Sequence, residues 1–149
     1  MGTAGQIYAA LKAQLGTAYT VLEAYDAMEA IDPSGTIALN ITEMEPMHHT
    51  GCDDWRFSVA VSGFTLADAD RDRSIMQAMS EHVMRSIDAD ALKAAIDCCA
   101  GVVIGAYSAN SDGDSNEFTL GISIYVAPAT WDAVDASSNS GDSSNQQQQ

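Results

Sequence analysis

An alternation between apolar and polar side chains with a period of two is the feature that most constrains this fold. Between residues 118 and 126, apolar side chains occupy every second position: Phe118, Leu120, Ile122, Ile124 and Val126. Successive side chains of a β-strand point to opposite faces, so this segment is predicted to be a strand with one apolar face. Residues 55–61 alternate in the same way. The chain must therefore build a sheet and cover one of its faces.

Helical periodicity predicts the elements that cover this face. Ile7, Leu11 and Leu15 recur every four residues, which predicts an N-terminal helix over 3–15. A longer central helix is predicted over 69–87, where Asp68 or Asp70 can cap its first turn. Its apolar side chains gather on one face of the helix: Ile75, Met76, Met79, Val83 and Ile87.

Shorter patterns predict the remaining elements. Strands are expected at 17–25, 37–42 and 102–107, and a short helix at 89–97. A long exposed connection, 43–54, is expected to join the second and third strands. The resulting order, α-β-β-β-α-(α)-β-β, predicts an α+β fold. Its mostly antiparallel sheet carries the N-terminal helix and the long central helix on one face.

The composition divides the 149 residues at about residue 128. Residues 1–128 are expected to form a single domain, since their number is common for one domain. Residues 129–149 consist mainly of Ser, Asn, Asp, Gly and Gln and end in four glutamines. Such a segment buries too little apolar surface to offset its ordering entropy, so we expect a disordered tail.

The charge balance disfavours polyanionic partners. The chain has 21 acidic and 6 basic residues, with a formal net charge of −15. Proteins that hold nucleic acid or anionic lipid cluster Lys and Arg on one surface. We therefore expect binding to neither nucleic acid nor a membrane. The three cysteines, two of them adjacent at Cys98 and Cys99, favour reduced thiols in a cytoplasmic setting.

Two groups of side chains have metal-ligand types. One group lies in the 43–54 connection and comprises His48, His49, Cys52, Asp53 and Asp54. Zinc sites draw on two separated pairs of ligands, and here there is one crowded group, so a polar hairpin tip is preferred. The other group is Asp112, Asp114 and Asn116, which the turn of a hairpin explains without an ion. Ion binding by either group stays open.

The sequence contains no enzyme motif. It has no Gly-rich phosphate loop, no Gly-x-Ser-x-Gly elbow and no His-Glu-x-x-His pair. We expect neither an enzyme nor a cofactor. Three methionines, by contrast, fall where solvent is expected, because Met84 lies away from the apolar face of its helix and Met44 and Met47 lie in the connection. Exposed Met is common at adaptable contact surfaces, which favours self-association.

The order of four predicted segments, and the pattern of apolar residues along them, resemble those of a known family. An opening helix at 6–15 leads into strands, the strand at 56–63 leads to the helix at 69–87, and the closing hairpin ends at 121–126. Over about residues 5–127 the chain resembles the tail-terminator and tail-completion proteins of long-tailed bacteriophages, the minor tail protein U group, and their relatives in prophages and contractile injection particles. The resemblance implies an α+β fold without catalytic residues. It also implies a hexameric ring that caps the head-proximal end of the tail tube and joins it to the neck.

The resemblance further implies partners and a location. The partners are other copies of the chain in a homo-oligomeric ring, the tail tube protein and a neck or head-completion protein. The location is the tail or neck of the virion, with assembly in the host cytoplasm. The acidic charge would let DNA pass through the lumen without specific binding. Another phage component (a neck connector, baseplate or tube protein) is the first alternative, and a small metal- or ligand-binding protein using His48, His49 and Cys52 is the second.

A ring subunit needs contacts to its neighbours, and these are expected at the 43–54 connection and on the central helix. Half of the six basic residues lie on that helix, where they can pair with the acidic surface of a neighbour. The candidates for the subunit interface are Met44, Met47, His48, His49, Arg71, Arg73, Met84 and Arg85.

Overall fold

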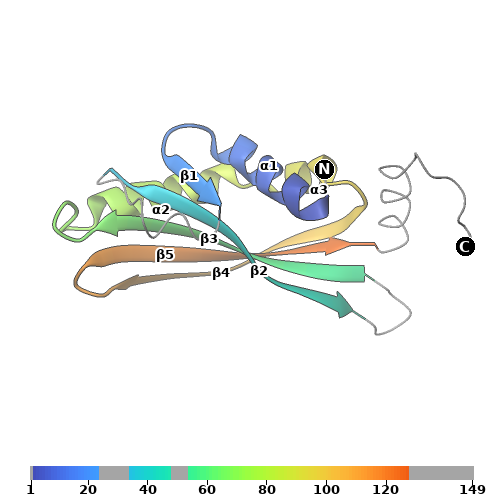
Figure 1. Cartoon of the computed structure of the whole chain (residues 1–149). Coiled ribbons are helices and arrows are strands. Elements are labelled where there is room, and N and C mark those ends of the chain that lie inside the picture. The colour runs from blue at the N-terminus through green and yellow to red at the C-terminus, as the bar shows by residue number, and fades with distance from the viewer. Residues whose placement is uncertain (1, 24–33, 48–53, 128–149) are drawn as a thin grey trace, which may run out of the picture.

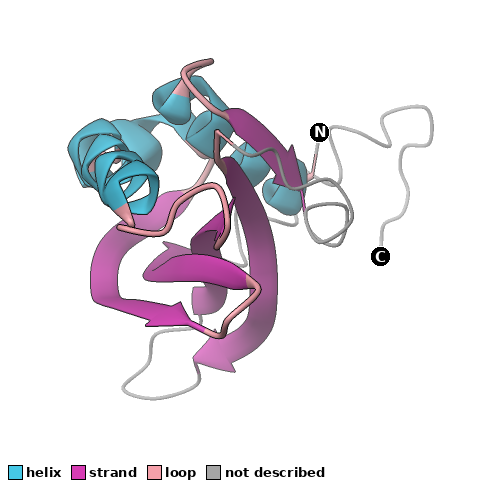
Figure 2. Cartoon of the chain, turned by 90° about the vertical axis from the view of Figure 1, so that its left-hand side faces the viewer, coloured by secondary structure: helices cyan, strands magenta, loops and turns pink. Residues whose placement is uncertain are grey.

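The computed structural model describes residues 2–23, 34–47 and 54–127, and it confirms the α+β class and the element order. The helices are α1 (Thr3–Leu15), α2 (Ser74–Ser86) and α3 (Ala89–Ala95). The strands are β1 (Thr20–Glu23), β2 (Thr36–Met47), β3 (Asp54–Leu66), β4 (Cys99–Ser111) and β5 (Ser115–Val126). All three helices lie on one face of a twisted sheet (Figures 1 and 2).

The sheet has the strand order β1-β2-β3-β5-β4. β1 runs parallel to β2, and every other neighbouring pair is antiparallel. The chain leaves β3, forms the two helices α2 and α3, and returns to the far edge of the sheet before β5 fills the place beside β3. This crossover makes β4 an edge strand, a position that sequence spacing alone does not determine.

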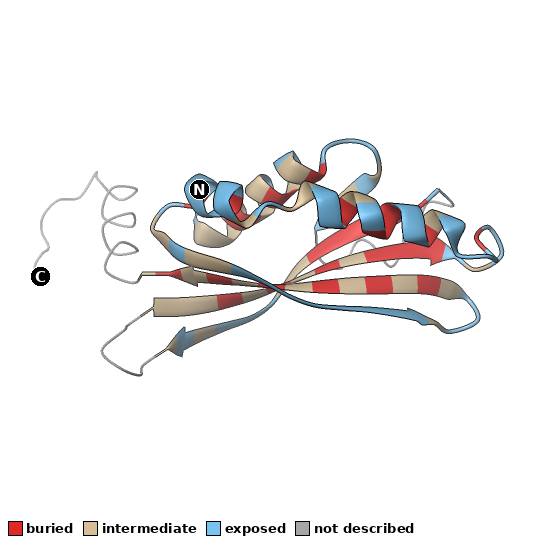
Figure 3. Ribbon diagram, turned by 180° about the vertical axis from the view of Figure 1, so that it is seen from behind, coloured by how far each residue is buried: buried red, intermediate tan, exposed pale blue. Residues whose placement is uncertain are grey.

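The core lies between the helices and the sheet, as the two periodicities predict. The alternate residues of β5, from Phe118 to Val126, are buried against the helices. Ile7, Leu11 and Leu15 of α1 are buried with them, and so are three residues of α2. Figure 3 shows buried positions alternating with half-buried ones along the strands beneath the helices. The predicted strand at 55–61 buries its odd-numbered side chains from Phe57 onward in the same way.

Gly63 allows one close contact within this core. It stands opposite Phe118 in the β3–β5 ladder. A Cβ atom added at Gly63 would lie 2.0 Å from Cε2 of the Phe118 ring. The ring therefore occupies the space that any larger residue at this position would need.

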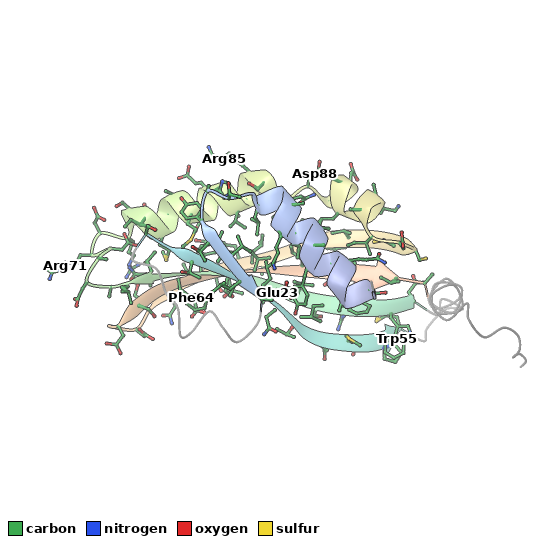
Figure 4. The ribbon with its side chains drawn as sticks, turned by 45° about the horizontal axis from the view of Figure 1, so that its top comes forward. Glu23, Trp55, Phe64, Arg71, Arg85 and Asp88 are labelled. Carbon is green, nitrogen blue, oxygen red and sulfur yellow. The ribbon has the colours of Figure 1, made fainter. Side chains whose placement is uncertain are left out.

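The face of the sheet away from the helices carries a smaller apolar cluster. Ala38 and Phe64 are buried there, and Leu22 packs against them. Phe64 projects from the sheet on the side away from α2 (Figure 4).

The expected long connection at 43–54 is wrong, because both strands continue into it. Met44 stands opposite Phe57 and Met47 opposite Asp54 in the ladder. Across this extension, Arg56 of β3 forms ion pairs with Glu43 and Glu45 of β2. The two carboxylates are attached two residues apart and share one face, so a single guanidinium can reach both.

The central helix also begins later than predicted, at Ser74 rather than at residue 69. The preceding residues form turns because Asp70 folds back into the protein. Its carboxylate accepts hydrogen bonds from the N–H groups of Ile75 and Met76, at 2.8 and 3.0 Å. Asp70 thus caps α2 as predicted, but from outside the helix and through a buried side chain.

The other boundaries differ by a few residues. β1 is shorter than the predicted 17–25 strand, whereas β4 and β5 are longer than expected and leave only residues 112–114 between them. In that turn, the Asp112 carboxylate accepts hydrogen bonds from the N–H groups of Asp114 and Ser115. The predicted disordered tail at 129–149 lies outside the described residues.

Candidate assembly surface

The outer edge of β4, here called the β4 edge, is the most exposed part of the sheet. β4 is the last strand in the sheet order, so only β5 pairs with it among the described strands. From Val103 to Asn110 every residue is exposed, and Figure 3 shows this part of the strand in the exposed colour. The edge therefore presents a row of backbone N–H and C=O groups to solvent.

The side chains along the β4 edge are uncharged, and several are large and apolar. Val103, Ile104 and Tyr107 expose 54%, 40% and 39% of their surface. The ladder to β5 is interrupted between Ile104 and Tyr107. No residue of β4 carries a charge, although the whole chain carries −15.

Helix α2 lies along the same side of the molecule and extends this apolar surface. The hydroxyl groups of Ser80 and Tyr107 are hydrogen-bonded at 2.8 Å, which places one face of α2 beside β4. The Tyr107 ring also stacks on Phe118, with centroids 5.9 Å apart. Met84 follows Ser80 by one helical turn and is 53% exposed. The exposed Met84 therefore belongs to the β4 side of α2.

A second edge lies on the opposite side of the sheet. β1 pairs with β2 only from Thr36 to Leu39. Beyond that point β2 has β3 as its only partner among the described strands, and we call the outer side of Asn40–Met47 the β2 edge. The N–H group of Ile41 donates to the Tyr8 hydroxyl at 3.1 Å, so the accessible part of this edge begins after Ile41. Met44 within it is 51% exposed.

A buried polar network fixes the N-terminal end of α2. The Asp70 carboxylate, 1% exposed, also accepts a hydrogen bond from the Thr65 hydroxyl at 2.8 Å. The Asn116 amide donates to the Asp70 backbone carbonyl at 2.8 Å and, more weakly, to its carboxylate. Burial raises the pKa of Asp70, but these hydrogen bonds outweigh burial and hold the pKa below its ordinary value.

The arginines of this segment project into solvent. Arg71 and Arg73 flank the turn before α2, and Arg73 has a φ of 61°, a left-handed conformation that is uncommon outside glycine. Arg85 lies near the other end of the helix, and Figure 4 shows Arg71 and Arg85 pointing away from the protein. Within the described part of the chain, none of the three forms an ion pair. All three can therefore meet carboxylates of another molecule.

The predicted interface residues do not form one patch. Met44 and Met47 lie at the end of the sheet where β2 finishes, whereas Arg71 and Arg73 lie beside Asp70 at the opposite end. A sheet of this length spans about 40 Å, at roughly 3.3 Å per residue. Met84 and Arg85 occupy exposed positions on α2. His48 and His49 lie outside the described residues.

Sequence reasoning missed the exposed apolar residues of β4. The run 102–107 was predicted as a strand, but its place at the edge depends on the sheet order. One sequence signal was available. Val103, Ile104 and Tyr107 lie in a 13-residue strand without any charged residue, whereas β2 and β3 both contain charges.

The described residues contain no group of three or more His, Cys, Asp or Glu side chains that could hold a metal ion. His48, His49, Cys52 and Asp53 lie outside the described ranges, so the structure does not test the first group, for which a polar hairpin tip stays the prediction. In the second group, Asn116 points inward to Asp70 while Asp112 caps its own turn. His82 is hydrogen-bonded to the Leu15 carbonyl at 2.8 Å and links α2 to α1.

The adjacent cysteines are both half-buried and free of disulfides. Burial raises the pKa of the Cys99 thiol, and this outweighs the opposing effects of Gly101 and Lys93. A raised pKa leaves less thiolate at neutral pH, which makes Cys99 a poor nucleophile. No described helix combines the length and the apolar character needed to cross a membrane.

Comparison with known proteins gives a likeness of fold. No protein-family model and no curated protein matches the chain. Among solved structures, the chain is similar to one chain from the virion of a native gene transfer agent particle, with a TM-score of 0.51 and 16% sequence identity. The match covers 84% of this chain and 97% of that one. The two chains therefore share an α+β fold over nearly all of the virion chain.

Proposed function

We propose that this protein is a structural component of a phage-like virion. In this role it forms an oligomeric ring, caps the head-proximal end of a tail tube and joins the tube to the neck. The observation that carries the proposal is the fold shared with a gene transfer agent virion chain over 97% of that chain's length. The element order that suggested the tail-terminator family supports the same role independently of this match.

The surfaces of the chain support a ring. Head-to-tail assembly requires two different surfaces on one subunit, and it closes into a ring when the rotation between subunits allows. The β4 edge and the β2 edge lie on opposite sides of one rigid sheet. The exposed arginines of the α2 segment add charged contacts, for which the tail tube and neck proteins are the proposed partners.

The charge of the chain supports passage of DNA through such a ring. At a net charge of −15, a ring of several copies repels the phosphate backbone at long range. DNA would slide through the lumen without being held. Location in the virion follows from the same proposal.

Electron microscopy of tails tests the role. Purified protein carrying a gold label is added to isolated tail tubes that lack it, and the position of the label is recorded. We expect one label site per tube, at the head-proximal end. Labels at the opposite end or along the tube would instead indicate a baseplate or tube protein. Tubes that remain unlabelled at saturating protein would contradict the proposal.

A further inference from the structure

We infer that β4 of one copy pairs as an antiparallel strand with the β2 edge of the next copy, so that the sheet continues from subunit to subunit. The inference rests on the proposed ring, because it takes a second copy of the chain as the partner. It goes further by naming the two strands, their relative direction and the residues that meet.

The β4 edge lacks the features that normally keep edge strands apart. Soluble proteins protect exposed edges with charged side chains, proline or covering segments. β4 contains neither a charged residue nor proline over 13 residues, and it exposes Val103 and Ile104. In a chain with a net charge of −15, such an edge is also where a second copy can approach with least repulsion.

The β2 edge offers a partner of matching length. It is accessible from about Thr42 to Met47, because the Tyr8 hydroxyl already binds the N–H group of Ile41. The β4 ladder is continuous from Gly101 to Ile104 before its interruption. The β2 ladder is regular from Glu43 to Met47, and within it only Pro46 lacks an N–H group. Each edge thus presents a short run of regular strand. Met44, 51% exposed, supplies the apolar side chain on the β2 side.

The two edge segments, one in β4 and one in β2, are at matching positions along the strand direction. One row across the sheet connects Val102 of β4 through Ile124 and Phe57 to Met44 of β2. The next row connects Val103 through Ser123 and Ser58 to Glu43. Rotation about an axis parallel to the strands therefore brings Val102 of one copy beside Met44 of the next.

The strand directions determine how the copies pair. β2, β3, β5 and β4 alternate in direction across the sheet, so β4 runs opposite to β2. A copy placed beside β4 by the same rotation presents β2 in the opposite direction to β4. The new pair is then antiparallel, like the three antiparallel pairs within the subunit.

The same geometry places Val103 next to a negative group. Arg56 lies between Glu43 and Glu45, and this trio keeps one net negative charge. Val103 of the neighbouring copy is level with Glu43 and projects on the same face of the sheet. A carboxylate at position 103 would be repelled across the contact, whereas an ammonium group would be attracted.

This charge dependence gives the test. Self-association of the full chain is measured by sedimentation velocity for wild type, Val103→Glu and Val103→Lys. Leu66→Glu and Leu66→Lys are the matched controls, since Leu66 is an exposed residue away from both edges. We expect Val103→Glu to weaken association more than tenfold and Val103→Lys to keep it within about threefold. The two Leu66 variants should differ little from each other.

Other outcomes separate the alternatives. Equal loss with Glu and Lys at position 103 would indicate a two-fold contact of β4 with itself, and would overturn the pairing with β2. Association unchanged in both Val103 variants would overturn the inference but leave the ring intact. A wild-type chain that stays monomeric, alone and with tail tubes, would contradict the ring itself.

Backbone hydrogen exchange provides a second measurement. It detects backbone pairing between β4 and β2, which an association through side chains alone would not produce. In the associated wild type, amides of Val102–Ile104 and of Glu43–Glu45 should exchange at least tenfold more slowly than in Val103→Glu. Protection of β5 should be equal in both proteins, which shows that the variant is folded. Equal exchange in the two edge segments would contradict strand pairing.

Discussion

The Asp70 carboxylate is the buried group whose removal tests the description of this fold most sharply. Replacing Asp70 with Ala removes an acceptor that is 1% exposed and receives hydrogen bonds from β3, α2 and β5. The N–H groups of Ile75 and Met76 lose their cap. The Thr65 hydroxyl loses its acceptor as well.

The cost follows from these contacts. Loss of a helix cap costs about 1 kcal/mol. A buried donor left without an acceptor costs about 1–3 kcal/mol, and Thr65 becomes such a donor unless it finds a new partner. Together these effects predict a loss of about 2–4 kcal/mol in the free energy of unfolding. At roughly 4 °C per kcal/mol, the melting temperature should fall by about 8–16 °C.

Thermal melting followed by circular dichroism measures this change. The matched control is Asp72→Ala, which removes the same charge two residues away. Asp72 is exposed and accepts a hydrogen bond from the Ser74 N–H group at 3.0 Å. Its loss should be much smaller, because water can replace the carboxylate. Similar melting temperatures for the two variants would refute the argument that burial makes Asp70 costly.

The pH dependence gives a further check of the same residue. Hydrogen bonds hold the pKa of folded Asp70 below its ordinary value of 3.8 despite burial. A carboxyl group with a lowered folded pKa stabilises the protein above the unfolded pKa, and loses this effect as the pH falls through the folded pKa. The stability difference between wild type and Asp70→Asn should therefore be constant near neutral pH and shrink below about pH 4. A difference that grows on acidification would contradict the lowered pKa.

Three further substitutions test separate parts of the structure. Gly63→Ala should lower the free energy of unfolding in urea by about 3 kcal/mol, because its Cβ atom would lie 2.0 Å from the Phe118 ring; an unchanged midpoint would exclude this close contact. Tyr8→Phe should cost about 1 kcal/mol and speed hydrogen exchange at the Ile41 amide, and unaltered exchange there would count against the hydrogen bond. Met84→Glu should weaken self-association in light scattering at an unchanged melting temperature, since Met84 is 53% exposed; full retention of oligomers would remove Met84 from the interface.

Hydrophobic periodicity in the sequence correctly predicted which faces of the helices and strands are buried. The alternation from Phe118 to Val126 and the four-residue spacing of Ile7 and Leu11 correctly identified the faces that are buried. The α+β class followed from these faces, because an apolar sheet face needs helices to cover it. These patterns are strong because one face of each element is buried. Burial selects an apolar residue at every second position of a strand and at every third or fourth position of a helix.

The predicted start of α2 and the predicted end of β2 were wrong because both depend on contacts between segments that are distant in the sequence. The late start of α2 depends on Asp70 reaching Thr65 and Asn116, and Asn116 is 46 residues away. The longer β2 depends on Arg56 bridging Glu43 and Glu45, which look like loop residues when β3 is not beside them.

The assembly surface was only partly predictable for the same reason. Met84 and Met44 were identified as exposed apolar residues, and the structure confirms that both are exposed. Val103 and Ile104 were not identified, because an edge strand and a central strand with the same apolar run differ only in their neighbours. The sheet order that exposes them arises from the crossover through α2 and α3.

The mass of the assembled particle tests the central proposal most directly. Native mass spectrometry of the purified chain, alone and after incubation with tail tubes, gives the number of 15.7 kDa copies that associate. A ring at the end of a tail tube predicts a closed species of six copies, either in solution or on joining the tubes. A chain that remains monomeric under both conditions, or that forms open-ended chains of variable length, would contradict it.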